Sequence, residues 1–302
     1  MTATLSVLVG IEITDANLTS STAAEPATGE VAWASGTNYT VDTVVYRATT
    51  HRRYKCLIAG INAGLPEETP LRWFDLGPTN RWAMLDGDTS TQTAVTSPCT
   101  VVLHPGHFNS VYLGGLDASD ISVTVKDAPG GNVIYSYTGS LEGSMPPDYY
   151  EYFFDPFKPM RDLLLGGIEP FSNAEISVTL NSGGPVKCAV LRVGDLRPLG
   201  RTLSGAKAKP KSYSRIKIDD EGHNVIARGK KAKDMSASAL LAIEEANTVL
   251  ETITDLLDLP CVWVCTDSPD YAGLRQYGLG SAEVSFDHTT HAILTLNVNG
   301  LI

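Results

Sequence analysis

The histidines are the first residues of this 302-residue sequence that could do chemistry. His104 and His107 in LHPGHF, and His288 and His291 in FDHTTHA, have H-x-x-H spacing. This spacing can place two imidazoles near one metal ion on a helix, but the Pro-Gly inside the first pair forbids a helix there. The second pair lies in a predicted turn, and neither pair has a third ligand nearby in sequence. We therefore expect ordinary turn histidines and no metal.

Asp86 and Asp88 in LDGDTS could form an acid pair or part of a calcium loop. An EF-hand needs a glutamate at its twelfth position, which is Ser97 when counted from Asp86. Two carboxylates one residue apart in a loop usually shape a turn. The sequence has no G-x-S-x-G, no phosphate-binding glycine loop and no Cys–His signature in a suitable context. We predict no catalytic residue, no cofactor and no enzymatic activity.

The bulk composition is that of a globular protein, with 43% hydrophobic and 19% charged residues. The five cysteines are scattered, so we expect buried thiols instead of a disulfide framework. No stretch reaches 18 consecutive apolar residues, and MTATLSVLVGIEITD lacks the features of a signal peptide. These observations predict synthesis in a cytoplasm and no insertion into a membrane.

The net charge of −11 argues against general affinity for nucleic acid, yet the charge is uneven. Residues 201–233 contain ten of the 23 basic residues and only three acidic ones. We predict that this basic segment docks on an acidic protein partner, because only Tyr213 is suited to stacking on bases. The predicted docking residues are Lys207, Lys209, Lys211, Arg228, Lys230, Lys231 and Lys233.

Aromatic residues are concentrated between Glu30 and Asp75, where short apolar patches separated by polar turns predict a small β module. Exposed aromatic rings in such modules stack on sugar rings. The candidate sugar-binding residues are Trp33, Tyr39, Tyr54 and Trp73. The alternative interpretation is that so small a domain needs these rings for its core.

The segment GPTNRWAMLDGDTSTQT lies between this module and the next run of strands. Arg81, Trp82 and Met84 offer an amphipathic stem, an indole and a pliable thioether, which suit packing of one module on another. We interpret the segment as an interdomain joint and expect Trp82→Ala to loosen the domain arrangement before it affects any binding.

The remaining pattern predicts a mainly β fold with three domains. Residues 1–92 hold an N-terminal strand, the small β module and the joint. Residues 93–200 contain seven candidate strands, typical of an antiparallel β-sandwich of jelly-roll type. Residues 201–302 predict a small α+β domain with one long helix over Ser236–Leu259, ended by Pro260. The aromatic run YYEYFFDPF is expected to be a strand of the sandwich.

The segment from Val31 to Gly77 resembles the small chitin-binding-type carbohydrate module. The residues carrying the resemblance are Trp33, Tyr39, Val45, Tyr54, Pro66 and Trp73. Asp42 stands where that pattern has Gly, and Asp tolerates the left-handed conformation better than most residues. The resemblance implies a β fold and, less specifically, sugar binding.

Nearly the whole chain resembles a family of tailed-bacteriophage virion proteins. The resemblance rests on GPTNRWAMLDG, FNSVYLGGLDASDISVTVKDAPGGNVIYSYTG, YYEYFFDPF, SYSRIKIDDEGHNVIARGKKAKDMS and the ending ILTLNVNGLI. Leu85 replaces the family's usual Phe, and the acidic turn at 219–224 is longer than usual. The resemblance implies a structural protein of the tail or baseplate region and transfers no catalytic residue.

Three functions are open at the level of sequence. The first is a structural subunit of the tail tip, baseplate or collar, present in several copies in a symmetric assembly with other tail proteins and located in the virion. The second is a dedicated carbohydrate-binding adsorption protein for host-surface glycan. The third, a glycan depolymerase, would need two facing carboxylates in a cleft, and no sequence feature indicates such a pair.

Overall fold

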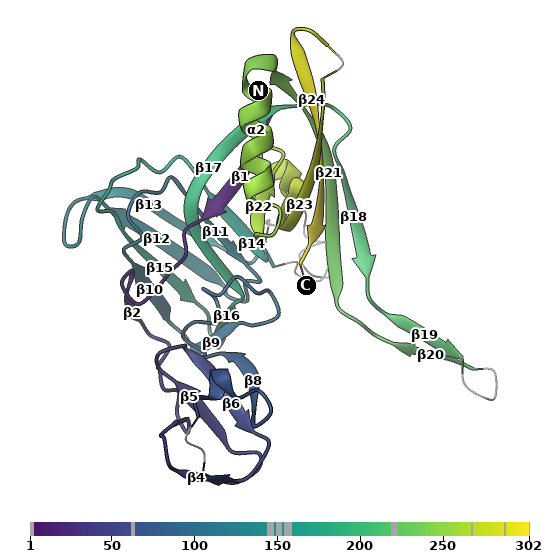
Figure 1. The fold of residues 1–302 in the computed structure, drawn as a ribbon. Helices are drawn as coiled ribbons and strands as arrows, with labels where there is room; N and C mark the ends of the chain where they lie inside the picture. The colour runs from purple at the N-terminus through teal and green to yellow at the C-terminus, as the bar shows by residue number, and fades with distance from the viewer. Residues whose placement is uncertain are drawn as a thin grey trace. The chain divides into compact units, whose positions relative to one another are not determined.

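The computed structural model describes residues 3–61, 64–143, 148, 153, 159–218, 223–266, 268–286 and 288–301. The described chain is mainly β, with large antiparallel sheets and one long helix (Figure 1). This architecture confirms the predicted mainly β class. The strand expected over YYEYFFDPF lies outside the described residues, apart from Phe153.

Two compact units make up the chain, and one of them combines two segments that are distant in sequence. Unit 1 consists of Met1–Gly10 and Gly194–Ile302, and unit 2 is Ile11–Val193. The first strand, predicted to belong with the small β module, is instead grouped with the C-terminal third of the chain. The reason is pairing: β1 (Thr4–Gly10) hydrogen-bonds on one side to β17 (Val190–Thr202) and on the other to β22 (Cys261–Val264).

Unit 2 contains a β-sandwich-like body. One sheet has the order β13-β12-β15-β10-β2, and its strands are β2 (Leu18–Ser21), β10 (Cys99–Leu103), β12 (Asp120–Lys126), β13 (Val133–Ser140) and β15 (Glu175–Asn181). The opposing strands are β9 (Thr93–Thr96), β11 (Ser110–Gly114), β14 (Asp162–Leu165), β16 (Pro185–Cys188) and the start of β17. Side chains alternate along each strand, so Ile121, Val123 and Val125 all enter one core.

The small β module of unit 2 follows the predicted pattern of short strands. Its sheets have the orders β3-β5-β6-β8 and β4-β7. The elements are β3 (Val31–Ala32), β4 (Asn38–Tyr39), β5 (Val44–Arg47), β6 (Arg52–Cys56), β7 (Gly60–Ile61), the 3-10 turn η1 (Pro66–Glu68) and β8 (Trp73–Pro78). Asp42 has φ 69°, so the position where the chitin-binding pattern has Gly does adopt the left-handed conformation.

Unit 1 is a long antiparallel sheet covered by one helix. Its strand order is β17-β1-β22-β23-β24-β21-β18. The remaining elements are β18 (Lys207–Ser212), β19 (Arg215–Ile218), β20 (Asn224–Ala227), β21 (Lys231–Ala242), α2 (Ile243–Asp255), η2 (Pro269–Leu274), β23 (Arg275–Ser285) and β24 (His291–Gly300). Ala246, Val249 and Ile253 form the buried stripe of α2.

The predicted helix over Ser236–Leu259, ended by Pro260, is wrong at both ends, because α2 spans only Ile243–Asp255. Residues up to Ala242 continue β21, and the helix begins at Ile243. Met235, Ala237 and Ala239 are buried while the residues between them are not, which is the two-residue period of a strand. Alanine favours helices and is depleted in strands, so the local preference opposes a strand here, and pairing with β24 overrides it. After the helix the sequence pattern predicts strands at Cys261–Cys265 and Ala292–Val298, which correspond to β22 and β24, whereas it does not predict β23 between them.

Candidate functional site

The predicted basic docking segment forms an exposed edge and hairpin in unit 1. Strand β18 is the last strand of its sheet and pairs only with β21 among the described strands. Beyond it the chain continues into the two-stranded ribbon of β19 and β20 (Figure 1). We call residues 207–231 the basic arm; its turn at 219–222 lies outside the described residues.

The cations of the basic arm are exposed, and most have no ion-pair partner within the described residues. Lys211 is the exception, with Nζ 3.9 Å from Asp234 Oδ2 and 5.0 Å from the Tyr213 ring centre. A hydrogen bond from Lys211 to Tyr213, and then the charge of Asp234, raise the pKa of Lys211. The exposed cations without such a partner are Lys207, Lys209, Arg215, Lys217, Arg228, Lys230 and Lys231. Lys233 is only partly exposed and donates a hydrogen bond to the Arg275 carbonyl at 3.0 Å.

One face of the ribbon is apolar. Ile216 lies directly opposite Ile226, and Ile218 is two residues along the same strand. Side chains two apart share a face of a strand, so the three isoleucines lie together. Their exposed fractions are 69% for Ile216, 72% for Ile218 and 62% for Ile226. An isolated hairpin is marginally stable in water, and an exposed apolar face of this kind is typical of a contact surface. The face was not predicted, although the R-I-K-I alternation in the sequence is its signal.

Gly229 lies at the junction between the arm and the sheet. A Cβ atom on this residue would lie 2.4 Å from the carbonyl carbon and oxygen of Tyr213. Its N–H donates to Ser214 Oγ at 3.1 Å, and the Tyr213 N–H donates to the Lys230 carbonyl at 3.0 Å. The close approach of the two backbones therefore requires glycine.

Three of the four candidate sugar-binding aromatics belong to the core of the small β module. Tyr39, Tyr54 and Trp73 are buried together with Val45, and Tyr39 meets Trp73 edge-to-face with ring centres 5.3 Å apart. The fourth ring, Trp33, packs against this cluster beneath the Arg47 guanidinium, which lies 4.9 Å from the ring centre. These rings therefore do not form an exposed stacking platform. The core interpretation holds because a module this small has few other side chains to bury.

Phe74 is an exposed aromatic residue of the same module that was not among the predicted sugar-binding residues. It is 56% exposed and lies on β8 directly opposite Lys55 of β6. Lys55 is also opposite Val44 of β5, so Val44, Lys55 and Phe74 follow one another across the outer face. The exposed Phe74 ring is a flat apolar surface on which a sugar ring could stack, and Lys55 beside it is paired with Asp42 at 2.7 Å.

The joint segment builds a buried polar cluster around Glu25. The Glu25 carboxylate accepts hydrogen bonds from Thr79 Oγ1 at 2.7 Å and from the Trp82 indole N–H at 3.0 Å. His51 Nδ1 lies 3.1 Å from the same carboxylate, and its Nε2 lies 3.0 Å from Asp15. The His51 ring stacks on Trp82 with centres 4.1 Å apart. Trp82 was predicted to belong to the joint, whereas Glu25 and His51 were not, because they are distant in sequence.

The other two joint residues also contact distant segments of unit 2. Arg81 donates from Nε to the Ala23 carbonyl at 2.9 Å, and Met84 is buried in the sandwich core. Further along, Asp86 accepts a hydrogen bond from the Asp88 N–H at 2.8 Å, and Asp88 accepts one from the Ser90 N–H. The two aspartates thus form turns, as predicted. Burial raises the pKa of Asp86.

The histidine pairs and cysteines hold no metal site in the described part of the chain, where no group of three or more His, Cys, Asp or Glu side chains could hold an ion. His104 lies 2.9 Å from the Asn173 side chain, and the rings of His288 and His291 stack with centres 4.2 Å apart. All five cysteines are free and buried, which confirms the prediction of buried thiols. Burial raises the pKa of Cys188 to about 12.

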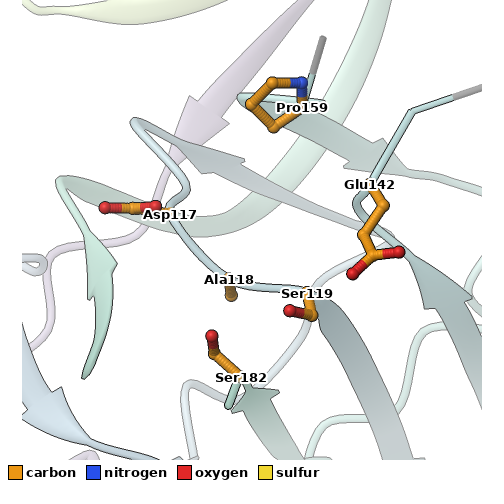
Figure 2. A pocket seen from close by; sticks show the side chains of 6 residues that line it. All are labelled: Asp117, Ala118, Ser119, Glu142, Pro159 and Ser182. Atoms are coloured by element: carbon orange, nitrogen blue, oxygen red, sulfur yellow. The ribbon is translucent and has the colours of Figure 1, made fainter. Parts of the chain in front are cut away.

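A pocket of about 290 Å³ lies at one end of the sandwich sheet in unit 2. It is lined by Asp117, Ala118, Ser119, Glu142, Pro159 and Ser182 (Figure 2). Figure 2 shows the Glu142 carboxylate directed toward Ser119, while the Asp117 carboxylate points away from it. Asp117 instead lies 3.5 Å from Lys187 Nζ. The two carboxylates among the described lining residues, Asp117 and Glu142, therefore do not face each other.

Comparisons with known proteins do not assign a family. No protein-family model and no curated protein matches the chain. A solved structure titled "X-ray crystal structure of reduced XRCC1 bound to DNA pol beta catalytic domain" is similar over 52% of this chain and 96% of that chain, with 15% identity and a TM-score of 0.27. A likeness at this level does not indicate a function. In the described residues, no helix has the length and apolar character needed to cross a bilayer.

Proposed function

We propose that this protein is a non-enzymatic structural subunit of a bacteriophage tail, in the tail-tip, baseplate or collar region. The observation that carries the proposal is the basic arm, whose isoleucines and most of whose cations are left uncovered by the described chain. A surface with an apolar centre and charged surroundings is typical of a site for another protein. The resemblance of GPTNRWAMLDG and ILTLNVNGLI to tail proteins supports the same function.

The test is to locate the chain in particles. Phage from lysed cells that encode this protein would be purified by density gradient, analysed by mass spectrometry, and labelled with gold-conjugated antibody against the chain. We expect the chain in intact particles and gold at the tail. Its presence only in the particle-free lysate, or gold on the capsid alone, would refute the proposal.

The second candidate is an adsorption protein that binds host-surface glycan, and exposed Phe74 is the observation that favours it. A cell-wall pull-down with the full chain should then retain the wild type and lose Phe74→Ala. Leu71→Ala is the matched control, because Leu71 is 85% exposed and has no ring to stack on a sugar. Equal retention of the Phe74→Ala variant and the wild type would exclude this face as the sugar site.

A further inference from the structure

The basic arm and the helix α2 carry opposite charge within the same unit. Residues 201–233 hold ten basic and three acidic residues, which leaves 13 of the 23 basic and 31 of the 34 acidic residues elsewhere in the chain. An excess of acidic residues follows the basic segment directly in the sequence. Residues 234–274 contain eight acidic residues and no Lys or Arg.

The solvent face of α2 is acidic. Glu244, Glu251 and Asp255 are exposed, and their spacing of seven and then four residues places them on one side of the helix. Asp255 and the following Asp258 lie at the C-terminal end, which carries the negative end of the helix dipole, and the last turn has no basic residue. Carboxylates at this end are unfavourable unless a cation compensates them, and the described chain provides no ion pair there.

Exposed leucines accompany these carboxylates. Leu250 is 37% exposed, and Leu257 and Leu259, just beyond the helix, are 44% and 52% exposed. The helix end therefore has an apolar patch beside an acidic one. The basic arm has the matching combination, with Ile216, Ile218 and Ile226 on one face and cations around them.

We propose that the basic arm of one copy docks on the C-terminal part of α2 of a second copy of this protein. The isoleucines would cover the leucines, and the arm cations would lie against Glu251, Asp255 and Asp258. Pairing of β18 with another strand edge is a poorer alternative, because Lys207, Lys209 and Pro210 mark it as an edge protected from strand addition.

The arm and α2 are different patches, so the contact is heterologous and generates a ring or a filament when it repeats. This inference adds a contact between copies to the proposed function. Only the location of the assembly, in the phage tail, rests on that proposed function. Self-association can be measured on the purified protein, whereas the tail role is tested in particles. Failure of either experiment therefore leaves the other one informative.

The test is self-association by analytical ultracentrifugation at low salt, with four variants of the full chain. The arm variant is Lys230→Glu with Lys231→Glu, and the helix variant is Glu251→Lys with Asp255→Lys. The third combines all four changes. The control, Arg161→Glu with Arg197→Glu, makes the same charge change as the arm variant at exposed residues outside the arm.

We expect the wild type and the control to associate with similar constants, and the arm and helix variants to weaken association by about tenfold or more. The combined variant should regain most of the loss, because the attraction is restored with reversed sign. A mixture of arm and helix variants should also regain association, because an unchanged arm meets an unchanged helix and a reversed arm meets a reversed helix. A salt concentration of ~1 M, at which the Debye length is about 3 Å, should weaken the wild-type contact because it screens the charges.

Three outcomes would overturn the proposal: a wild type that stays monomeric at about 100 μM, an arm variant that associates as well as the control, or a combined variant no better than either parent. Circular dichroism and thermal melting of each variant show whether the fold is intact. If the charge variants did not fold, Ile216→Ser with Ile226→Ser would test the same contact, again with an expected loss of about tenfold.

Discussion

At the scale of single residues, Glu25 decides how the joint of unit 2 is held. Its side chain is 7% exposed and meets Thr79, Trp82 and His51. A buried carboxylate is tolerated only when hydrogen bonds compensate its lost hydration. These contacts supply that compensation and at the same time connect three segments far apart in sequence.

Replacing Glu25 by Ala should destabilise unit 2 by about 3 kcal/mol, because it leaves the indole N–H, the Thr79 hydroxyl and the His51 nitrogen without their acceptor. The free energy of unfolding in urea measures the effect. Asp15→Asn is the control: it contacts the other nitrogen of His51, but its side chain is 77% exposed, so the cost should stay below about 1 kcal/mol. Equal losses in the two variants would contradict this role of Glu25.

Because of Cys188, the free energy of unfolding should decrease as the pH rises into the alkaline range. Its thiol is fully buried and donates to the Val190 carbonyl at 3.5 Å, and burial raises its pKa from 9.0 to about 12. Between these values the unfolded chain loses the proton and the folded chain keeps it, so this contribution to stability is present below pH 9.0 and lost as pH rises toward about 12.

The free energy of unfolding, measured in urea for the wild type and Cys188→Ala, checks this. The advantage of the wild type should shrink by about 3 kcal/mol between about pH 8 and about pH 11, given ~1.4 kcal/mol per pKa unit. A pH-independent difference between the two proteins would show that the buried thiol is not the source.

At the scale of elements, the basic arm depends on the junction at Gly229. Gly229→Ala should move the two backbones apart, because the added Cβ would lie 2.4 Å from Tyr213 carbonyl atoms. We expect faster hydrogen exchange of the β19 and β20 amides, weaker self-association and a nearly unchanged melting temperature. Gly183→Ala is the matched control, since nothing lies within 4 Å of its Cβ position. Unchanged exchange in the Gly229 variant would contradict the requirement for glycine.

At the scale of the whole molecule, unit 1 is completed by the N-terminal strand β1, which pairs with strands from the C-terminal third of the chain. Strand β1 lies between β17 and β22, and Leu5 and Val7 have no exposed surface. The first ten residues thus provide an interior strand for unit 1, whose other residues all follow position 193.

Removing residues 1–10 should unfold unit 1 and leave unit 2 folded, because an interior strand with buried side chains is lost. Limited proteolysis with mass spectrometry would show this as cleavage within residues 194–302 and protection of the sandwich. Addition of a synthetic peptide of residues 1–10 should restore part of the protection. Protection of residues 194–302 without the peptide would contradict the central role of β1.

Several features were predictable from the sequence alone. Strict alternation at Ile121, Val123 and Val125 specifies a strand with one buried face, whatever the topology. The Asp-Gly-Asp turn and the basic composition of residues 201–233 are equally local properties. These features could be predicted because each of them depends only on residues close to it in the sequence.

Other features were decided only by tertiary structure, because they depend on contacts between distant segments. Burial of Tyr39 and Trp73 follows from how the module closes, not from the residue types, which suit a sugar platform equally well. The Glu25 cluster joins positions more than 20 residues apart. Residues 236–242 form a strand because β24 is available to pair with them. Local preference was too weak to decide these cases, and long-range pairing and burial decided them.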